Sequence, residues 1–564
     1  MNYRHELANI LQEKVNIDKD YVMQSLEVPE RHLGDFALPC FKLAKEQKKA
    51  PAAIAQEMAT QLQNTIPFVE SVQQAGPYIN FYLKKDDFAK NVLSEVIEKG
   101  TDYGSSTIGN GKTIVVDYSS PNIAKPFHVG HLRSTVMGQA LYNIYSFLGY
   151  TCVGVNHLGD WGTQFGKLIV AYNLWSSKEA VEEGGIAELN RIYVKFHQEA
   201  KEDPTLDDKG RACLLKMEEG DRETLDIWQF FYDISMKEFK RIYKRLGVDF
   251  DYYTGESFYN DKMAPVVKEL KEKGLLQESD GAQIVDLEHE GLPPCMILRS
   301  DGATLYSTRD LATVFYRKET FDFHKVLYLT AIDQALHFNQ FFKVIKLMGY
   351  DWWEGLLHVP FGLVTLEEGK LSTREGNVVL MEDLLDAVVN RAKEIIQEKN
   401  PNLANKEDVA NAVGIGSVIF NDLYNTRIKS VVFSLEKMLN FDGETGPFVQ
   451  YSHARANSLL KKGGAIDFAT VDYACLTDEA AQNLLAQIYQ YKDRLLEVTE
   501  KNEPYILTRY LTNLAQTFNK FYQSNPIISQ DTDIKNARLA LVYATKNILH
   551  NGLKLLGINA PDQM

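Results

Sequence analysis

The chain has 564 residues, of which 45% are hydrophobic and 24% are charged, and its formal net charge is −15. This composition suffices for several buried cores, and the acidity argues against a protein wrapped uniformly by nucleic acid, although it is compatible with local basic surfaces. Five scattered cysteines without a CxxC pair exclude a disulfide framework and a zinc knuckle. No apolar run approaches the roughly 18 residues of a membrane span, and the charged start lacks a signal peptide's apolar core, so we expect a cytoplasmic protein without membrane contact.

Residues 1–110 are expected to form a separate α+β domain. Helical periodicity covers residues 3–15 and 51–63, and residues 68–88 alternate like two strands broken by a Gly-Pro pair. The Gly-, Ser- and Thr-rich segment 101–112 is typical of a linker.

From residue 111 to residue 382 the pattern predicts an α/β core. Short β-branched apolar runs, each followed by a loop and an amphipathic helix, are typical of a doubly wound, Rossmann-like parallel sheet. The runs span residues 113–118, 151–158 and 325–333. The highly charged, helix-like stretch 178–246 is interpreted as an insertion between two halves of the sheet.

Beyond about residue 383 the strand signals stop. Apolar periodicity predicts a helical connector over residues 383–445 and an all-α domain over residues 446–564.

The stretch "SSPNIAKPFHVGHLRS" places His128 and His131 on either side of Val129-Gly130, at a strand-to-helix junction. Ligands of parallel sheets bind beyond the carboxyl ends of strands, where free helix amides attract anions. Gly130 would let a flat base approach the backbone, both imidazoles can donate to phosphate oxygens, and Lys125 adds a fixed charge. The pattern indicates a nucleoside triphosphate. A zinc pair, which would need a third ligand, and two ordinary surface histidines are the alternatives.

A second stretch, "EEGKLSTREGNVVLMEDLL", strengthens the nucleotide hypothesis. Lys370, Ser372, Thr373 and Arg374 lie in a polar loop ahead of a helix. Cations and hydroxyls on a mobile loop can close on a pyrophosphate leaving group. Alone the signal is weak, but it gains weight from following the histidine motif in this order.

"HVGH" and "KLSTR" resemble the HIGH and KMSKS signatures of class I aminoacyl-tRNA synthetases. More narrowly, "SSPNIAKPFHVGHLRST", "NHLGDWGTQFG", "TLYSTRDLAT" and "GPFVQYSHARANS" are similar to the arginyl-tRNA synthetase family, and the match runs nearly end to end. The resemblance implies that L-arginine is activated by ATP, with Mg²⁺ in the substrate complex, and then transferred to the 2′-hydroxyl of the terminal adenosine of tRNA(Arg). It implies no tightly bound cofactor and no metal site, and relatives are often monomers.

The resemblance also implies roles for individual residues. Thr373 stands where the second lysine of KMSKS is usual, and we hypothesise that Lys125 supplies the missing charge. The catalytic set is then His128, His131, Lys125 and Lys370, and the ATP-binding set adds Gly130, Ser372, Thr373 and Arg374. The arginine-binding set is Asp117, Asn122, His128, Tyr306, Asp310 and Gln334, in which two acids suit a cationic side chain.

Contacts to tRNA are expected at both ends of the chain. Most aromatic residues of the C-terminal helices should be core, yet loop bases need stacking and edge contacts. The resemblance and the basic-aromatic pattern select Tyr78 and Asn80 near the start and Tyr451, Arg455, Asn457, Arg538 and Met564 near the end.

His157, in "NHLGDWGTQFG", is expected either to line the site or to belong to a structural turn with a packed Trp161. Three other functions compete with arginine activation. A glutamyl or cysteinyl synthetase would need a cationic pocket or zinc-binding cysteines, a small-molecule adenylyltransferase would lack the flanking domains, and an inactive relative would lose motif residues.

Overall fold

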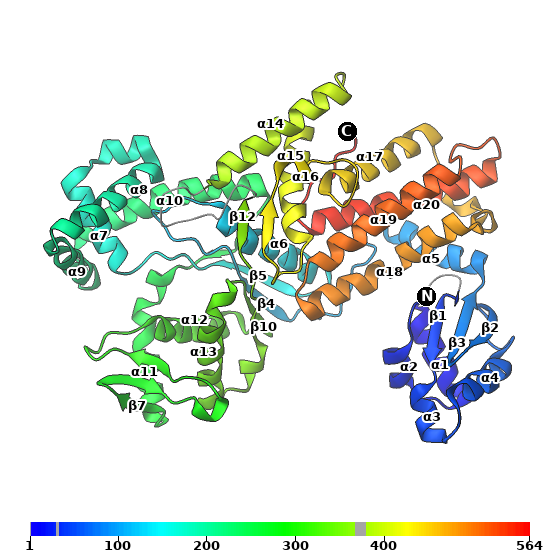
Figure 1. Ribbon diagram of the computed structural model, residues 1–564, viewed down its shortest axis with the longest axis horizontal. Helices are drawn as coiled ribbons and strands as arrows, with labels where there is room; N and C mark the ends of the chain where they lie inside the picture. The colour runs from blue at the N-terminus through cyan, green and yellow to red at the C-terminus, as the bar shows by residue number, and fades with distance from the viewer. Residues whose placement is uncertain (1, 30–32, 367–378) are drawn as a thin grey trace.

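A computed structural model describes residues 2–29, 33–366 and 379–564 of the chain. Its centre is a five-stranded parallel sheet in the order β11-β10-β4-β5-β6 (Figure 1). The strands span Thr113–Asp117 (β4), Thr151–Asn156 (β5), Tyr252–Tyr253 (β6), Lys325–Tyr328 (β10) and Leu356–His358 (β11).

Both faces of this sheet are buried. Ile114 and Val116 point into one hydrophobic core with Leu141 of α6 (Leu132–Phe147), whereas Val115 and Val326 point into a second core. The second core also contains side chains of α12 (Tyr306–Phe321) and α13 (Ala335–Leu347). Because successive side chains of a strand face opposite ways, continuous apolar runs such as "TIVVD" need cover on both faces. The prediction of a doubly wound sheet is confirmed.

The connections bring several helix starts to one edge of the sheet. In a parallel sheet, a helix that follows one strand and precedes the next begins at the carboxyl edge. α6 follows β4, α7 (Thr163–Trp175) follows β5, and α13 follows β10, while α12 ends just before β10. Their first turns therefore gather at the carboxyl edge, where the site lies.

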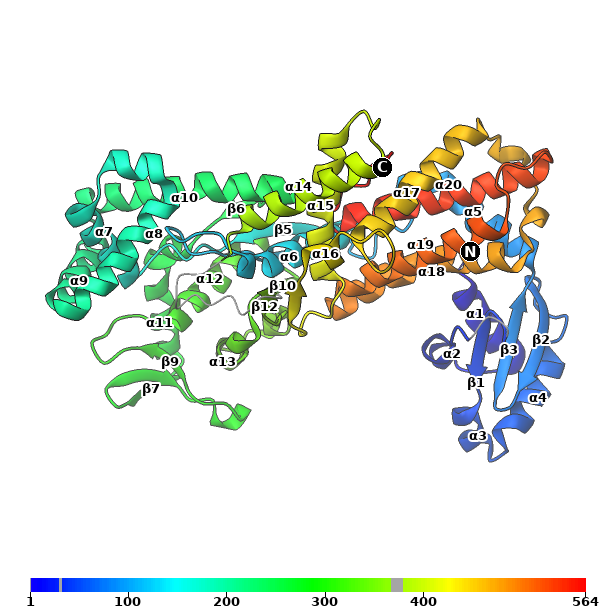
Figure 2. The ribbon, with the colours of Figure 1, turned by 45° about the horizontal axis from the view of Figure 1, so that its top comes forward.

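Two insertions extend the core. The predicted helical one consists of α8 (Lys178–Glu202), α9 (Thr205–Glu218) and α10 (Arg222–Leu246) and, with α7, forms one end of the molecule in Figures 1 and 2. The other was not predicted: after α11 (Met263–Glu272), an antiparallel sheet in the order β7-β8-β9 is inserted. Its strands are Leu276–Ser279, Ala282–Val285 and Cys295–Leu298. Each is only four residues long, so they give little periodic signal.

The N-terminal unit is an α+β fold, as predicted. Its antiparallel sheet has the order β1-β3-β2, and its predicted helices are present. The elements are α1 (Tyr3–Val15), α2 (Lys19–Ser25), β1 (Phe36–Pro39), α3 (Phe41–Gln47), α4 (Pro51–Leu62), β2 (Val69–Ala75) and β3 (Tyr78–Leu83). In both views this unit lies at the end of the molecule opposite the helical insertion (Figures 1 and 2).

The C-terminal part is helical, with one exception. Its helices are α14 (Met381–Lys399), α15 (Lys406–Leu423), α16 (Leu435–Met438), α17 (Gly446–Gly463), α18 (Glu479–Lys501), α19 (Tyr505–Ser524) and α20 (Thr532–Leu555). The expectation that strands stop near residue 383 was wrong, because β13 (Val431–Phe433) pairs in parallel with β12 (Val364–Leu366). Three residues are too few for an alternating pattern to stand out.

The segment expected as a linker is packed rather than free. α5 (Lys85–Lys99) precedes it and lies against α18 and α20, with the Lys85 carbonyl accepting from Gln482 Nε2 at 3.2 Å. Tyr103 is buried and stacks on Tyr491 of α18, with ring centroids 6.1 Å apart. Segment 101–112 therefore helps fix the catalytic core to the C-terminal helices. Among the described residues, no helix is both long and apolar enough to cross a membrane.

Replacing Gly104 with alanine should destabilise this junction. Gly104 has φ +96°, and an added Cβ would lie 2.6 Å from Tyr491 Cε1. We expect a loss of about 1–3 kcal/mol in the free energy of unfolding, as for other overpacked sites, measured by denaturant or thermal unfolding. Gly111→Ala is the matched control, because Gly111 has φ +68° with nothing within 4 Å. Equal effects of the two changes would contradict the packing role of segment 101–112.

Candidate active site

The loop that leaves β4 carries backbone strain. Ser119, Ser120 and Ala124 all have positive φ, at 69°, 48° and 59°, which costs non-glycine residues of the order of 1 kcal/mol each. The Ser119 amide donates to Ser134 Oγ at 2.9 Å, and the Ala124 amide donates to Ser235 Oγ of α10 at 2.8 Å. A strained backbone of this kind persists only where surrounding contacts hold it. These contacts therefore fix the conformation of the loop that leads to the histidine motif.

The two histidines form a reciprocal cap at the start of α6. His128 Nδ1 accepts from the Gly130 amide at 3.0 Å, His131 Nδ1 accepts from the His128 amide at 3.2 Å, and the ring centroids are 3.9 Å apart. Since both Nδ1 atoms accept, each neutral ring carries its proton on Nε2. Burial and the neighbouring imidazole lower the pKa of His131 to about 3, and burial and Lys125 lower the pKa of His128. Both rings are therefore neutral donors at neutral pH.

Gly130 and Lys125 flank these rings. A Cβ on residue 130 would lie 2.7 Å from Cε1 of His128, so the glycine leaves room for that imidazole, a reason for glycine here that the sequence did not predict. Burial lowers the pKa of Lys125, whose Nζ lies 5.8 Å from the Tyr193 ring centroid of α8. The predicted cation thus lies between the histidine motif and the helical insertion.

The second signature, Lys370, Ser372, Thr373 and Arg374, lies outside the described residues. The chain that follows it is joined to the histidine motif. The Val129 amide donates to the Val379 carbonyl at 3.2 Å, and the Met381 amide donates to the Phe127 carbonyl at 3.0 Å. The histidine motif is therefore joined to residues 379–381 by an antiparallel backbone pairing that the sequence did not predict.

Arg133, in the first turn of α6, lies fully buried. Its guanidinium donates to the carbonyls of Thr426 at 3.1 Å, Gly362 at 3.3 Å and Lys429, and its Nε lies 3.6 Å from Asp422 Oδ1 of α15. Burial raises the pKa of Asp422 to about 6, against the opposing effect of Arg133. This arginine joins the histidine helix to the chain ahead of β12 and to the helical connector.

A second arginine extends the network to the C-terminal helices. Arg427 Nε lies 3.2 Å from Glu503 Oε1, in the turn between α18 and α19. The Arg427 guanidinium also donates to the Pro360 carbonyl at 3.1 Å, and its carbonyl accepts from the Gly362 amide at 2.8 Å. Arg427 thus joins three segments of the chain: the loop after α15, the residues ahead of β12 and the turn between α18 and α19.

Asp117 is not free to meet a ligand as predicted. Its Oδ2 lies 2.7 Å from NH2 of Arg317, which is fully buried on α12, and its Oδ1 accepts from Ser120 Oγ at 3.0 Å. An internal guanidinium, facing the Tyr328 ring at 5.5 Å, already neutralises this carboxylate. Asp117 therefore belongs to the floor of the site. Arg317 was missed, although its spacing from Tyr306 and Asp310 puts all three on one helical face.

Asn122 and the "HLGD" segment lie together. The Ile123 amide donates to the Gly159 carbonyl at 3.1 Å, and a Cβ on Gly159 would lie 1.8 Å from Asn122 Oδ1. His157 Nδ1 is buried without a partner among the described residues, and burial lowers the pKa of His157. Trp161 packs edge-on against Trp228, with ring centroids 5.8 Å apart. The segment therefore forms both a structural turn and part of the site wall.

The remaining predicted pocket residues lie at the mouth of the site. Tyr306 is 68% exposed at the start of α12, and Gln334 is exposed just ahead of α13. Asp310 is partly exposed, and its Oδ2 lies 2.5 Å from His337 Nε2. His337, three residues after Gln334, was not predicted.

Two further acids, also not predicted, line the same region. Asp160 accepts from the amide and hydroxyl of Ser257 at 2.8 and 2.7 Å, and burial raises the pKa of Asp160. Glu256 lies 3.6 Å from Arg309, and burial raises the pKa of Glu256 to about 7 despite that arginine. Together with Asp310, these acids give the carboxyl edge an acidic end, whereas His128 and Lys125 form a donor-rich end.

The predicted tRNA contacts differ in exposure. Tyr451 is 38% exposed, and Arg455 lies between the rings of Tyr451 and Tyr522, at 4.8 and 5.3 Å. Asn80 is only 3% exposed within β3, and Asn457 is buried with its side chain donating to the Asp562 carbonyl at 3.0 Å. The burial of these two side chains argues against direct contact with bases. The sequence alone did not predict that either asparagine is buried.

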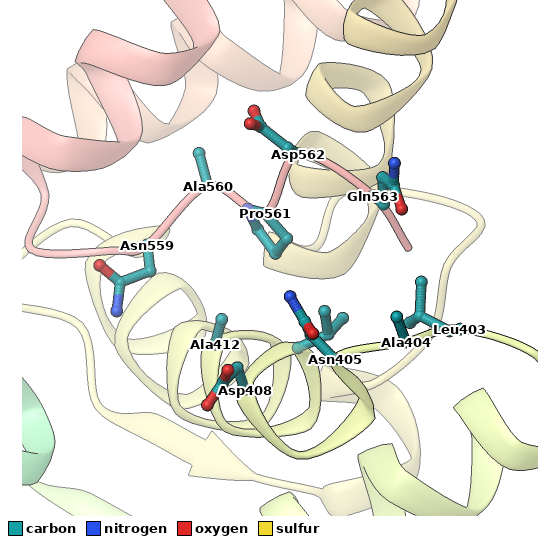
Figure 3. A pocket seen from close by; sticks show the side chains of 11 residues that line it. Leu403, Ala404, Asn405, Asp408, Ala412, Asn559, Ala560, Pro561, Asp562 and Gln563 are labelled. Atoms are coloured by element: carbon teal, nitrogen blue, oxygen red, sulfur yellow. The ribbon is translucent and has the colours of Figure 1, made fainter.

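The other candidates all make contacts within the protein. Tyr78 is half-buried beside Phe41, Arg538 donates to the Pro526 carbonyl at 2.8 Å, and the Met564 carbonyl accepts from Asn400 at 3.3 Å. The tail lines a cavity of about 470 Å³ against α15, in which Asn405, Asp408 and Asp562 are seen (Figure 3). The C-terminal segment is thus an ordered wall between two helical regions.

Comparisons with known proteins agree with this architecture. Three family models match: "tRNA synthetases class I (R), catalytic domain" over residues 92–435, "DALR anticodon binding domain" over 449–564, and "Arginyl tRNA synthetase N terminal domain" over 1–83. The arginine–tRNA ligases of Halothermothrix orenii and Alkaliphilus metalliredigens are 49% and 50% identical, each over 100% of both chains.

Solved structures match in fold. The arginyl-tRNA synthetase of Thermus thermophilus has a TM-score of 0.85 at 24% identity over 100% of both chains, and that of Plasmodium falciparum has a TM-score of 0.82 at 24% identity, covering 100% of this chain and 99% of the other. With catalytic, N-terminal and anticodon-binding family models in order and end-to-end relatives at about half identity, the chain belongs to the class I arginyl-tRNA synthetase family.

Proposed function

We propose that this chain is an arginine–tRNA ligase that activates L-arginine with ATP and transfers it to the 2′-hydroxyl of the terminal adenosine of tRNA(Arg), in cytoplasmic translation. The observation that carries the proposal is the division of the carboxyl edge into two ends. The donor-rich end, at the start of α6, suits a triphosphate, and the acidic end, at Asp310, suits a guanidinium.

At the donor-rich end the chemistry is positioning and charge neutralisation. The arginine carboxylate attacks the α-phosphate of ATP, the bond to the β-phosphate breaks, and pyrophosphate leaves with the Mg²⁺ that accompanies ATP. His128 and His131 offer two Nε2–H donors to phosphate oxygens, and Lys125 offers a positive charge. Lys370, Ser372, Thr373 and Arg374 would act on the leaving group. No covalent intermediate with the protein is required.

At the acidic end Asp310 is the partner that we assign to the guanidinium. Tyr306 and Gln334, which begin the adjoining helical turns, complete this end, and Asn122 lies toward the α-amino group and carboxylate of arginine. Asp117 contributes indirectly, since Arg317 already pairs with it. For tRNA(Arg), the candidates are the exposed Tyr451 and the partly exposed Arg455 on α17, with the partly exposed Tyr78 at the N-terminal unit. We expect a monomer.

Pyrophosphate exchange tests the function directly. In the presence of tRNA(Arg), exchange between ATP and radioactive pyrophosphate should occur with arginine and with no other standard amino acid, because the acidic end opposes anionic and neutral side chains. The assay is repeated without tRNA to find whether activation depends on it. Exchange with glutamate or cysteine, or no exchange with arginine under either condition, would refute the proposal.

Replacing Lys125 with alanine should collapse activation. If Lys125 compensates for Thr373, the variant should lose about 10²- to 10³-fold in the exchange rate, the cost typical of removing one electrostatic contact to a transition state. Its melting temperature should stay near that of the parent, since within the described part of the chain Lys125 is held by a cation–π contact to Tyr193 at 5.8 Å. Lys178→Ala, an exposed lysine at the start of α8, is the control. A near-normal rate in the Lys125 variant removes the compensation hypothesis.

A further inference from the structure

Three of the four acids named above, Asp117, Glu256 and Asp160, are already held by other groups. Asp117 faces the buried Arg317 at 2.7 Å, and Glu256 faces Arg309 at 3.6 Å. Asp160 accepts two hydrogen bonds from a single serine. A carboxylate paired with a permanent cation has little attraction left for a second one. These acids shape the site but are poor partners for an incoming guanidinium.

Asp310 has a different kind of partner. Its Oδ2 lies 2.5 Å from His337 Nε2, and since a carboxylate only accepts, His337 donates this hydrogen bond. The imidazole is held by Phe338 and Phe341, with ring centroids 5.6 and 5.5 Å away. An imidazole can hold a carboxylate without adding the permanent charge of an arginine or lysine.

The contact also joins two helices whose first turns flank the mouth of the site. Asp310 lies on α12, one turn after Tyr306, and His337 lies on α13, three residues after Gln334. Both side chains are about 30% exposed, at 28% and 30%. The pair is therefore accessible from solvent beside Tyr306 and Gln334.

We propose that His337 is a positioning residue for amino-acid specificity: by holding Oδ2 of Asp310, it directs the other carboxylate oxygen toward the guanidinium of arginine. The inference rests on the proposed function, in which Asp310 binds that guanidinium. A carboxylate with one oxygen fixed loses less rotational freedom when the ligand arrives, so arginine binds more tightly. ATP, bound at the donor-rich end, gains nothing from the contact.

Substitutions at His337 test this proposal, because they should change the KM for arginine and leave the KM for ATP unchanged. His337→Phe keeps an aromatic ring against Phe338 and Phe341 but removes the donor, and His337→Gln keeps a donor. Pyrophosphate exchange with tRNA(Arg) present should show the KM for arginine rising about tenfold or more in the Phe variant, as expected when a hydrogen bond to a charged group is lost. The KM for ATP and the melting temperature should stay unchanged, and the Gln variant should recover most of the loss.

One control and two further variants complete the design. His289→Phe makes the same exchange at an exposed histidine of the β7–β9 insertion and should change neither KM. His337→Asn, too short to reach Asp310, should repeat the selective loss if the Phe variant does not fold. Asp310→Asn should raise the KM for arginine at least as much as His337→Phe.

The outcomes distinguish the inference from the proposed function. An unchanged KM for arginine in both His337→Phe and His337→Asn, a parallel rise in the KM for ATP, or no recovery with Gln would overturn the positioning role. If Asp310→Asn raises the KM for arginine while His337 variants do not, only the positioning role fails. If the parent protein does not activate arginine, the proposed function itself fails.

Discussion

The arrangement of this molecule depends on one buried guanidinium, that of Arg133. A buried charge is tolerated only when it is paired and hydrogen-bonded. Here carbonyls of the chain ahead of β12 and of the loop after α15 accept from the guanidinium, and the Asp422 carboxylate, 3.6 Å from Nε, supplies the opposite charge. Removing one partner of such a group typically costs about 3–5 kcal/mol. The histidine motif two residues away is therefore fixed relative to the connector, and through Arg427 and Glu503 to the C-terminal helices.

Charge compensation also explains how an acidic site remains selective. Four carboxylates around one edge would repel one another, and burial would raise their pKa values until some were protonated. Arg317 pairs with Asp117, and Arg309 lies beside Glu256, whose pKa burial raises to about 7. Asp160 accepts hydrogen bonds from the amide and hydroxyl of Ser257. Of these four acids, Asp310 is the one whose partner is an imidazole rather than an arginine or a serine. Selectivity for arginine would then reside in one carboxylate, while the remaining acids give that carboxylate a rigid and nearly neutral frame.

Much of this could be predicted from the sequence, and the limits have physical causes. β-branched runs such as "TIVVD" predicted β4 because a strand buried on both faces must be apolar throughout, and "HVGH" predicted the start of α6. The partners of Asp117 and Asp310 could not be predicted, since Arg317 and His337 come from helices whose packing depends on the whole fold. The burial of Tyr103 could not be predicted, because its Gly- and Ser-rich neighbours indicate a linker. The burial of Asn80 could not be predicted either, because it depends on the segments that cover its strand.

The helical insertion has a role that its charged sequence did not suggest. Ser235 and Tyr243 of α10 hydrogen-bond to the strained loop, at the Ala124 amide and at Ser119 Oγ. α8 supplies the ring beside Lys125. Strain in that loop is unfavourable unless outside contacts over-determine it, so the histidine motif could not keep its geometry if α10 were absent. The insertion is therefore part of the donor-rich end: its charged sequence includes an inner face that supports the geometry of the site.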